Sequence, residues 1–261
     1  ERKKWKYKYS IKKKPFEIRL IGVDIAVMKG DNTVYTLCRL IPKGQDYIKQ
    51  VVYIEHQNNA HAELQAVRLK QLFEDFEADY AVCDVMGVGM NLYDACSKVI
   101  YDQIREVEYD AWVCMNREDM KDRVFGVDVR DALPVIYGCK ADAKFNHQIA
   151  VFLKGDFEKE NIELPISLDK ARDRYSESTE NMKIDKYLTP FIETDMLQKE
   201  LLAMENVNPE ATLIKLDNPH GRKDRFSSLS YLNYFSHILQ KDLNKLENGY
   251  DEDDDIILFL N

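Results

Sequence analysis

The spacing of apolar residues predicts a run of strands near the start of the chain. Residues 16–27 are apolar on both faces, which is typical of a buried strand. Residues 32–41 and 47–55 follow as two more strands, each preceded by a turn signal rich in glycine, proline or asparagine. Because such short connections join antiparallel neighbours, we expect a three-stranded meander.

A helix and a fourth strand come next. Residues 59–77 carry apolar side chains at helical spacing, and residues 79–85 form a short apolar run typical of a strand. A strand that is reached through a helix usually lies parallel to its partner. Gly87-Val88-Gly89 then turns the chain into a helix that we expect to extend to about Ile100.

The second half of the chain is less regular. Residues 144–159 and 194–205 have helical patterns, and the polar stretch 169–186 between them predicts a loop or insertion. Residues 212–216 indicate a short strand. From Phe226 a long helix carries one apolar stripe, formed by Leu229, Leu232, Leu239, Leu243 and Leu246.

This order of elements resembles a ribonuclease H-like α/β fold. We expect a mixed five-stranded sheet, an antiparallel meander plus parallel strands, flanked by helices. In such a sheet the first and fourth strands lie side by side. The length of 261 residues suits one large domain at 16–248, between a basic arm or linker at 1–15 and an acidic tail at 249–261.

Composition excludes several classes of protein. No apolar run approaches the roughly 18–20 residues that span a bilayer, and no apolar segment follows the Lys-rich start as in a signal peptide. The five cysteines are scattered, without CxxC spacing, which favours buried thiols in a reducing cytoplasm. The formal net charge of −9 is unevenly distributed, since eight of the first fourteen residues are Lys or Arg.

Three acidic residues stand where apolar elements end. Asp24 lies in the first strand and Asp84 at the carboxyl end of the fourth, where open sheets build their sites. Asp224 precedes the last helix. A buried Asp must be paired or bind metal, so a partner such as Arg39 or Lys140 is the alternative for Asp24. Helix capping is the alternative for the other two acids.

Neighbouring carboxylates of this kind can hold hard cations. Two Mg²⁺ or Mn²⁺ ions bound by three carboxylates can activate water and stabilise the leaving oxygen of a phosphodiester. Asp217 and His220 lie close to Asp224 in sequence and are possible substitutes for it, although His220 also fits an exposed turn after Pro219.

Three short motifs carry a resemblance to a known family. They are Gly22-Val23-Asp24-Ile25-Ala26, residues 82–89 (VCDVMGVG) and residues 222–229 (RKDRFSSL), and they are similar to the acidic motifs of viral (tailed bacteriophage) terminase large-subunit nuclease domains. Residues 133–137, 145–146 and 162–165 resemble the middle region of these domains. The likeness spans roughly residues 16–245. The third motif departs from many relatives, because Lys223 stands where they have a second acid.

The resemblance implies a function in viral genome packaging. It implies metal-dependent cleavage of double-stranded DNA, with Asp24 bridging two ions and Asp84 and Asp224 each completing one. It implies an upstream ATPase domain of the same polypeptide, a portal and a small terminase subunit as partners, no membrane, and the host cell cytoplasm as location. Arg222 and Lys223 are candidates for binding the DNA backbone.

Three other interpretations remain open. Another ribonuclease H-like nuclease, such as a resolvase or transposase core, predicts the same metal site. An actin-like nucleotide-binding fold shares the sheet order, but it expects a glycine-rich loop after the first strand, where residues 25–29 contain no glycine. A non-catalytic assembly domain would pair its acids structurally.

Overall fold

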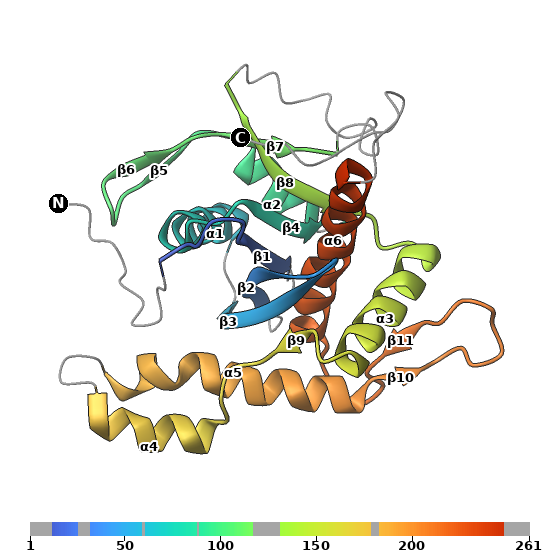
Figure 1. Ribbon diagram of the computed structural model, residues 1–261. Coiled ribbons are helices and arrows are strands. Elements are labelled where there is room, and N and C mark those ends of the chain that lie inside the picture. The colour runs from blue at the N-terminus through green and yellow to red at the C-terminus, as the bar shows by residue number, and fades with distance from the viewer. Residues whose placement is uncertain are drawn as a thin grey trace.

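The computed structural model describes residues 12–25, 32–58, 61–87, 89–116, 131–178 and 183–247. Its core is a mixed seven-stranded sheet with helices on both faces (Figure 1). The strands follow the order β7-β8-β4-β1-β2-β3-β9. Their bounds are β1 Ile18–Asp24, β2 Asn32–Lys43, β3 Asp46–Asn58, β4 Tyr80–Asp84, β7 Trp112–Cys114, β8 Leu133–Cys139 and β9 Ile162–Glu163.

The predicted pairing of the first four strands is confirmed. β1, β2 and β3 form the antiparallel meander, and β4 lies parallel to β1 on its other side. The mixed α/β class is confirmed too, but the sheet has seven strands instead of the expected five. The very short strands β7 and β9 extend its two edges, and two or three residues leave no readable period in a sequence.

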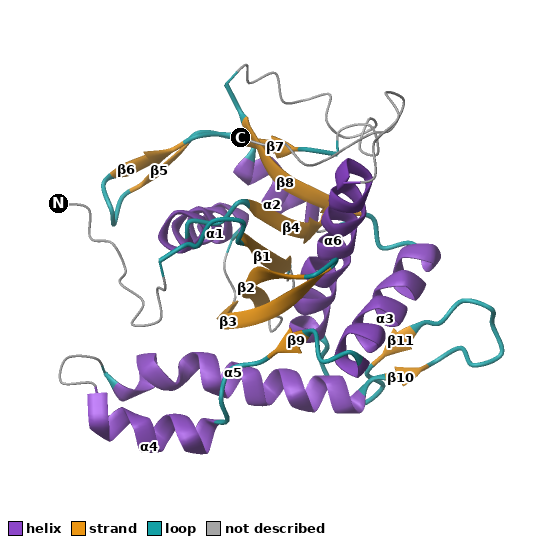
Figure 2. Ribbon diagram, viewed as in Figure 1, coloured by secondary structure: helices purple, strands orange, loops and turns teal. Residues whose placement is uncertain are grey.

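Helices cover the two faces of the sheet (Figure 2). One apolar core lies between the sheet and the pair α1 and α2, and a second lies between the sheet and α3, α5 and α6. The helices are α1 Ala62–Phe76, α2 Gly89–Cys96, α3 Ala143–Glu158, α4 Leu168–Ser178, α5 Ile184–Ala203 and α6 Asp224–Glu247. Two small hairpins, β5 (Ile100–Asp102) with β6 (Val107–Tyr109) and β10 (Glu205–Asn206) with β11 (Leu216–Asp217), lie outside the main sheet.

Alternation along β1 explains why the first strand is apolar on both faces. Ile21 and Val23 belong to the core under α1 and α2, whereas Leu20 belongs to the core under α6. Successive side chains of a strand point to opposite faces, so Gly22 and Asp24 share the α6 face with Leu20.

Several expected boundaries are wrong. Residues 169–178 of the polar stretch belong to α4 instead of a loop, because Leu168, Ala171 and Tyr175 form an apolar stripe that packs α4 against α5. α5 begins at Ile184, well before residue 194, and includes Pro190. α2 ends at Cys96, before residue 100, and the strand expected at 212–216 is the two-residue β11.

Other expectations concern burial and the chain ends. All five cysteines are buried free thiols, as expected. The acidic tail and most of the basic arm lie outside the described residues. Within the described part of the chain, no helix combines the length and the apolar character needed to cross a bilayer.

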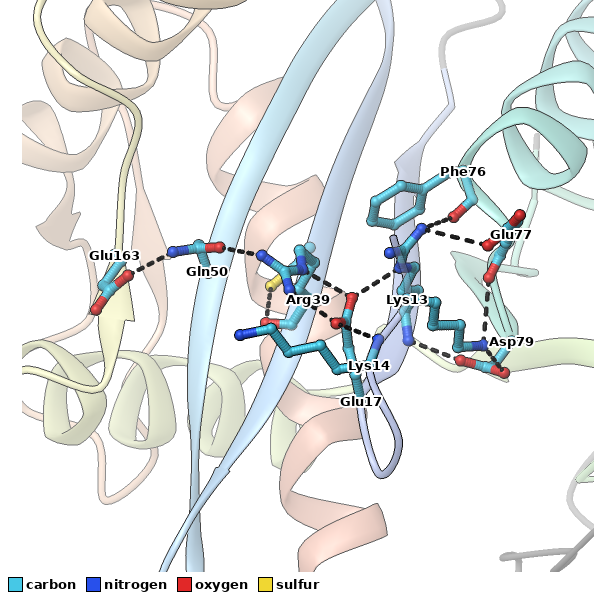
Figure 3. A network of polar contacts seen from close by, with 11 residues as sticks. Lys13, Lys14, Glu17, Arg39, Gln50, Phe76, Glu77, Asp79 and Glu163 are labelled. Carbon is cyan, nitrogen blue, oxygen red and sulfur yellow. Dashed lines mark hydrogen bonds and ion pairs between the residues drawn. The ribbon is translucent and has the colours of Figure 1, made fainter. Parts of the chain in front are cut away.

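A buried ion network stabilises the amino-terminal end of β1 (Figure 3). The carboxylate of Glu17 accepts hydrogen bonds from Arg39 Nε and Nη2 and from Arg19 Nε, each at 2.7 Å. Arg39 continues through Gln50 to Glu163 on β9. Burial alone raises the pKa of Glu17, but the hydrogen bonds from Arg39 and Arg19 outweigh it and lower the pKa to about 2.

Candidate active site

Two of the predicted acids lie at the carboxyl ends of neighbouring parallel strands. β1 and β4 pair in register up to Val23 and Cys83, so Asp24 and Asp84 follow at the next position of each strand. Neighbouring strands lie about 4.8 Å apart. Leu20 on β1 and Val82 on β4, which alternate in phase with the two acids, both belong to the core under α6. Asp24 and Asp84 therefore share the face of the sheet that α6 covers.

The turn after β4 is built closely around Asp84. Its Oδ1 accepts a hydrogen bond from the Met86 amide at 2.8 Å, which orients the carboxylate. α2 begins at Gly89 against the same backbone, where an added Cβ would lie 1.8 Å from the carbonyl oxygen of Asp84. Gly89 therefore permits a close approach that no other residue allows.

α6 brings the third acid to the same place. Ser228 on α6 donates its hydroxyl hydrogen to the carbonyl oxygen of Gly22 at 2.9 Å and lies 2.8 Å from Thr36 Oγ1 on β2. A Cβ on Gly22 would meet the Ser228 carbonyl oxygen at 2.2 Å, so the glycine lets the helix lie directly on β1. Asp224 is one turn before Ser228 on the same helix face. It therefore lies over the end of β1 that carries Asp24.

Electrostatics agree with this placement of the three acids. Burial raises the pKa of Asp24 well above its ordinary value, and the charges of Asp224 and Asp84 raise it further. Lys223 opposes this shift, whereas Glu200 adds to it. The carboxylate of Asp24 therefore experiences the negative charges of both Asp84 and Asp224.

Neither basic residue that was considered as a partner for Asp24 is paired with it in the structure. Arg39 binds Glu17 at the far end of the sheet, and Lys140 is exposed after β8. Neither is among the charges that shift the pKa of Asp24. Lys223 is instead the basic residue whose charge lowers the pKa of Asp24.

Sequence reasoning missed Tyr231, one turn beyond Ser227 on α6. The residue is buried, and burial raises the pKa of its hydroxyl, with Asp24 and then Asp84 adding to the shift. Its hydroxyl therefore experiences the negative charges of both strand acids. Its spacing of seven residues from Asp224 places both on the sheet-facing side of the helix, which is the one signal that the sequence offers.

Helix capping by Asp224, the alternative for this residue, does not describe the start of α6. The Phe226 amide, which a capping side chain at this position would bind, donates to Glu200 Oε2 on α5 at 2.9 Å. The Arg225 amide donates to the same oxygen at 2.8 Å. A carboxylate from another helix therefore caps α6.

The other predicted residues lie around this acidic centre. Lys223 Nζ is 3.0 Å from Asp217 Oδ1, and this bond is the main reason why the pKa of Asp217 is lowered. Arg222 Nη1 is 3.7 Å from Asp224 Oδ2. His220 is exposed in the turn before α6. Asp217 is therefore held by Lys223, and the exposure of His220 fits the alternative of a turn residue after Pro219.

The donor set suits a hard cation, but its side chains do not form a closed shell. Carboxylate oxygens are the ligands that Mg²⁺ and Mn²⁺ prefer. Within the described ranges, no three His, Cys, Asp or Glu side chains are arranged as a metal-binding group. The backbone brings the acids together, and metal binding requires their side chains to turn toward a shared ion, which would also relieve their repulsion.

Comparisons with known proteins were made at the level of sequence and of structure. No protein-family model and no curated protein sequence matches the chain. Among solved structures, the large terminase nuclease from thermophilic phage G20c with bound magnesium is 17% identical, with a TM-score of 0.51, covering 85% of this chain and 82% of that chain. The cobalt-bound form is 18% identical, with a TM-score of 0.49 and the same coverage.

A third structure has a similar description. The large terminase nuclease domain of Thermus phage P74-26 is 17% identical, with a TM-score of 0.45, covering 84% of this chain and 79% of that chain. At such identities a likeness concerns the fold, and the magnesium-bound G20c structure carries it. This chain therefore has the fold of a large terminase nuclease.

Proposed function

We propose that this chain is a divalent-metal-dependent endonuclease that cuts double-stranded DNA during viral genome packaging. The observation that carries the proposal is the convergence of Asp24, Asp84 and Asp224 from two strand ends and a helix start. The fold likeness to a large terminase nuclease supports it. The charges of Asp84 and Asp224 both raise the pKa of the half-buried Asp24, and acids that repel one another in this way favour a metal site over an assembly domain.

Each acid has a distinct part in the proposed site. Asp24, whose pKa is raised by the charges of both other acids, would contact two Mg²⁺ or Mn²⁺ ions, while Asp84 and Asp224 would each complete one. The ions, when bound, supply an activated water and charge stabilisation at the phosphate. The hydrogen bond from the Met86 amide fixes the orientation of the Asp84 carboxylate that would hold an ion.

DNA binding in this proposal depends on local charge. A net charge of −9 cannot attract DNA through the overall field of the protein. Arg222 and Lys223 lie beside the third acid, where they face the carboxylates of Asp224 and Asp217. We propose that both residues leave these carboxylates and bind DNA phosphates instead. Such contacts position the duplex without reading its sequence.

The proposed setting follows the resemblance described above. It includes an ATPase domain upstream in the same polypeptide, the portal and the small terminase subunit as partners, and the host cell cytoplasm as location. These partners and this location concern the whole packaging complex, whereas the nuclease activity is proposed for this domain alone.

Plasmid nicking tests the activity. The chain should convert supercoiled plasmid to nicked and linear forms with Mn²⁺ and should be inactive in EDTA. Asp24→Asn should abolish cleavage, because it removes a charge at nearly constant volume. Asp217→Asn is the matched control: it removes an acid that pairs with Lys223 and should remain active. Cleavage in EDTA, or cleavage by Asp24→Asn at the rate of the original chain, would contradict the proposal.

A further inference from the structure

The start of α6 depends on a residue that lies outside its own sequence neighbourhood. Glu200, near the end of α5, is 5% exposed, and both oxygens of its carboxylate accept hydrogen bonds from this helix start. Its Oε2 accepts from the amides of Arg225 and Phe226, at 2.8 and 2.9 Å. Its Oε1 accepts from Arg225 Nη1 at 2.9 Å.

Arg225 extends this contact into a second carboxylate. Its Nε and Nη2 lie 2.8 and 2.7 Å from Glu193 Oε2, also on α5. The other oxygen of Glu193 lies 2.8 Å from His56 Nδ1 on β3. The guanidinium of Arg225 therefore spans Glu193 and Glu200, two acids seven residues apart on the buried side of α5.

Glu193 and Glu200 on α5 differ in the groups of α6 that their carboxylates bind. Both pair with the guanidinium of Arg225, and both are buried. Glu200 also binds the first backbone amides of α6, which directly follow Asp224. Backbone amides fix the position and direction of a helix start, whereas a contact with the Arg225 side chain alone leaves them unconstrained.

Glu200 is not itself suited to bind a metal ion. Each of its oxygens already accepts hydrogen bonds from α6, and the side chain is enclosed between the two helices. Its effect on an ion must therefore pass through the residue that these amides position. That residue is Asp224, the first residue of α6.

We propose that Glu200 is a positioning residue that sets the place of Asp224 for metal binding, an inference that rests on the proposed function. Ser228 holds α6 to the sheet one turn into the helix, and Glu200 holds its first residues from the side of α5. Asp224 directly precedes both attachments, so its backbone has little freedom to move away from Asp24. Groups that orient a ligand in this way typically change metal affinity when they are removed.

Three variants distinguish the effect of Glu200 on the position of the α6 amides from the effect of its negative charge. Glu200→Gln keeps the size of the side chain but replaces one acceptor oxygen with an NH₂ group, which opposes either Arg225 or the α6 amides. Glu200→Asp keeps the charge, so Arg225 remains paired, but it is one methylene too short to reach the amides. Glu193→Gln is the matched control: it removes a buried charge from the same arginine without touching the amides of α6.

Calorimetric titration with Mn²⁺ and hydrogen exchange of the segment 224–230 are measured on each variant. We expect Glu200→Gln and Glu200→Asp to weaken Mn²⁺ binding by about 10- to 100-fold, as for other residues that orient a metal ligand. Both should speed amide exchange at Arg225 and Phe226. Glu193→Gln should bind Mn²⁺ within about twofold of the original chain, even if its melting temperature falls equally.

The possible results lead to different conclusions. Unchanged Mn²⁺ binding in Glu200→Asp would mean that charge, not position, is what Glu200 contributes, and it would overturn the inference. An equal loss in Glu193→Gln would overturn it too, because any damage to the network would then suffice. If the original chain binds no Mn²⁺, the proposed function fails and the inference with it, whereas normal binding by all variants contradicts the role of Glu200 alone.

Discussion

The hydroxyl of Ser228 donates a hydrogen bond to the carbonyl oxygen of Gly22 at 2.9 Å, joining residues that are 206 positions apart in the chain. Asp24 follows Gly22 by two residues on the same face of β1. Asp224 precedes Ser228 by one helical turn. This hydrogen bond therefore attaches the helix that carries the third acid to the strand that carries the first, and it depends on the absence of a side chain at Gly22.

Gly22→Ala tests this close approach of helix and strand. The new Cβ would lie 2.2 Å from the Ser228 carbonyl oxygen and 2.9 Å from Leu232 Cδ2, so α6 must shift. We expect a decrease of about 1–3 kcal/mol in the free energy of unfolding, as for other overpacked cores, together with a large decrease in cleavage. Gly155→Ala is the control, because its Cβ meets nothing within 4 Å and the change should stabilise α3 by about 0.5–1 kcal/mol. Urea denaturation measures the free energy of unfolding of both variants. A Gly22→Ala variant as stable as the original chain would contradict the expectation.

Asp24→Asn should separate stability from activity. Burial and the neighbouring acids raise the pKa of Asp24, so its ionised form destabilises the fold at neutral pH. The neutral variant should therefore melt higher in EDTA, by about 2–4 °C for each 1 kcal/mol of relieved repulsion. It should also lack the stabilisation that Mn²⁺ gives the original chain. A lower melting temperature in EDTA would show that the carboxylate is structurally paired instead.

The centre of the fold could be predicted because its sequence signals are local. The meander, β4 and α6 have clear apolar periods, and the strand order follows from the lengths of their connections. Asp24 and Asp84 could be placed side by side for the same reason, since each ends a buried strand and the two strands are parallel neighbours.

The parts that were missed depend on interactions between distant segments. The sequence analysis did not single out Glu200, because only the docking of α5 beside α6 makes it a cap. Its one signal is that Glu193 and Glu200 share the buried stripe of α5 with Leu197. β7 and β9 could not be predicted from the sequence because they have no apolar pattern of their own. They are strands only through their pairing with β8 and β3.

Arg222 and Lys223 should contribute to DNA affinity by binding phosphates. Replacing both by alanine should lower the slope of log affinity against log salt by about two units, one for each phosphate that is no longer neutralised. Asp217→Asn is the control, because it releases Lys223 from its partner and should leave the slope unchanged or larger. Fluorescence polarisation of one duplex across a salt series measures the slope, and an unchanged slope in the double variant would place DNA elsewhere.

Glu17 should make stability depend on acid pH. Its pKa in the folded protein is about 2, below its ordinary value of 4.5, so its contribution is complete above about pH 4.5 and disappears as pH falls toward 2. The full effect is roughly 3 kcal/mol. The stability difference between the original chain and Glu17→Gln should therefore be constant near neutrality and shrink below pH 4.5. A difference that stays constant down to about pH 3 would contradict this assignment.

The central claim is that Asp24, Asp84 and Asp224 form one metal site, and anomalous scattering from crystals soaked in Mn²⁺ tests it most directly. We predict two peaks among these three carboxylates, with Asp24 contacting both ions and the carboxylate of Glu200 still bound to the α6 amides. Crystals of Asp24→Asn should show neither peak. Manganese bound elsewhere, or no peak beside Asp24 at a concentration that supports cleavage, would contradict the account.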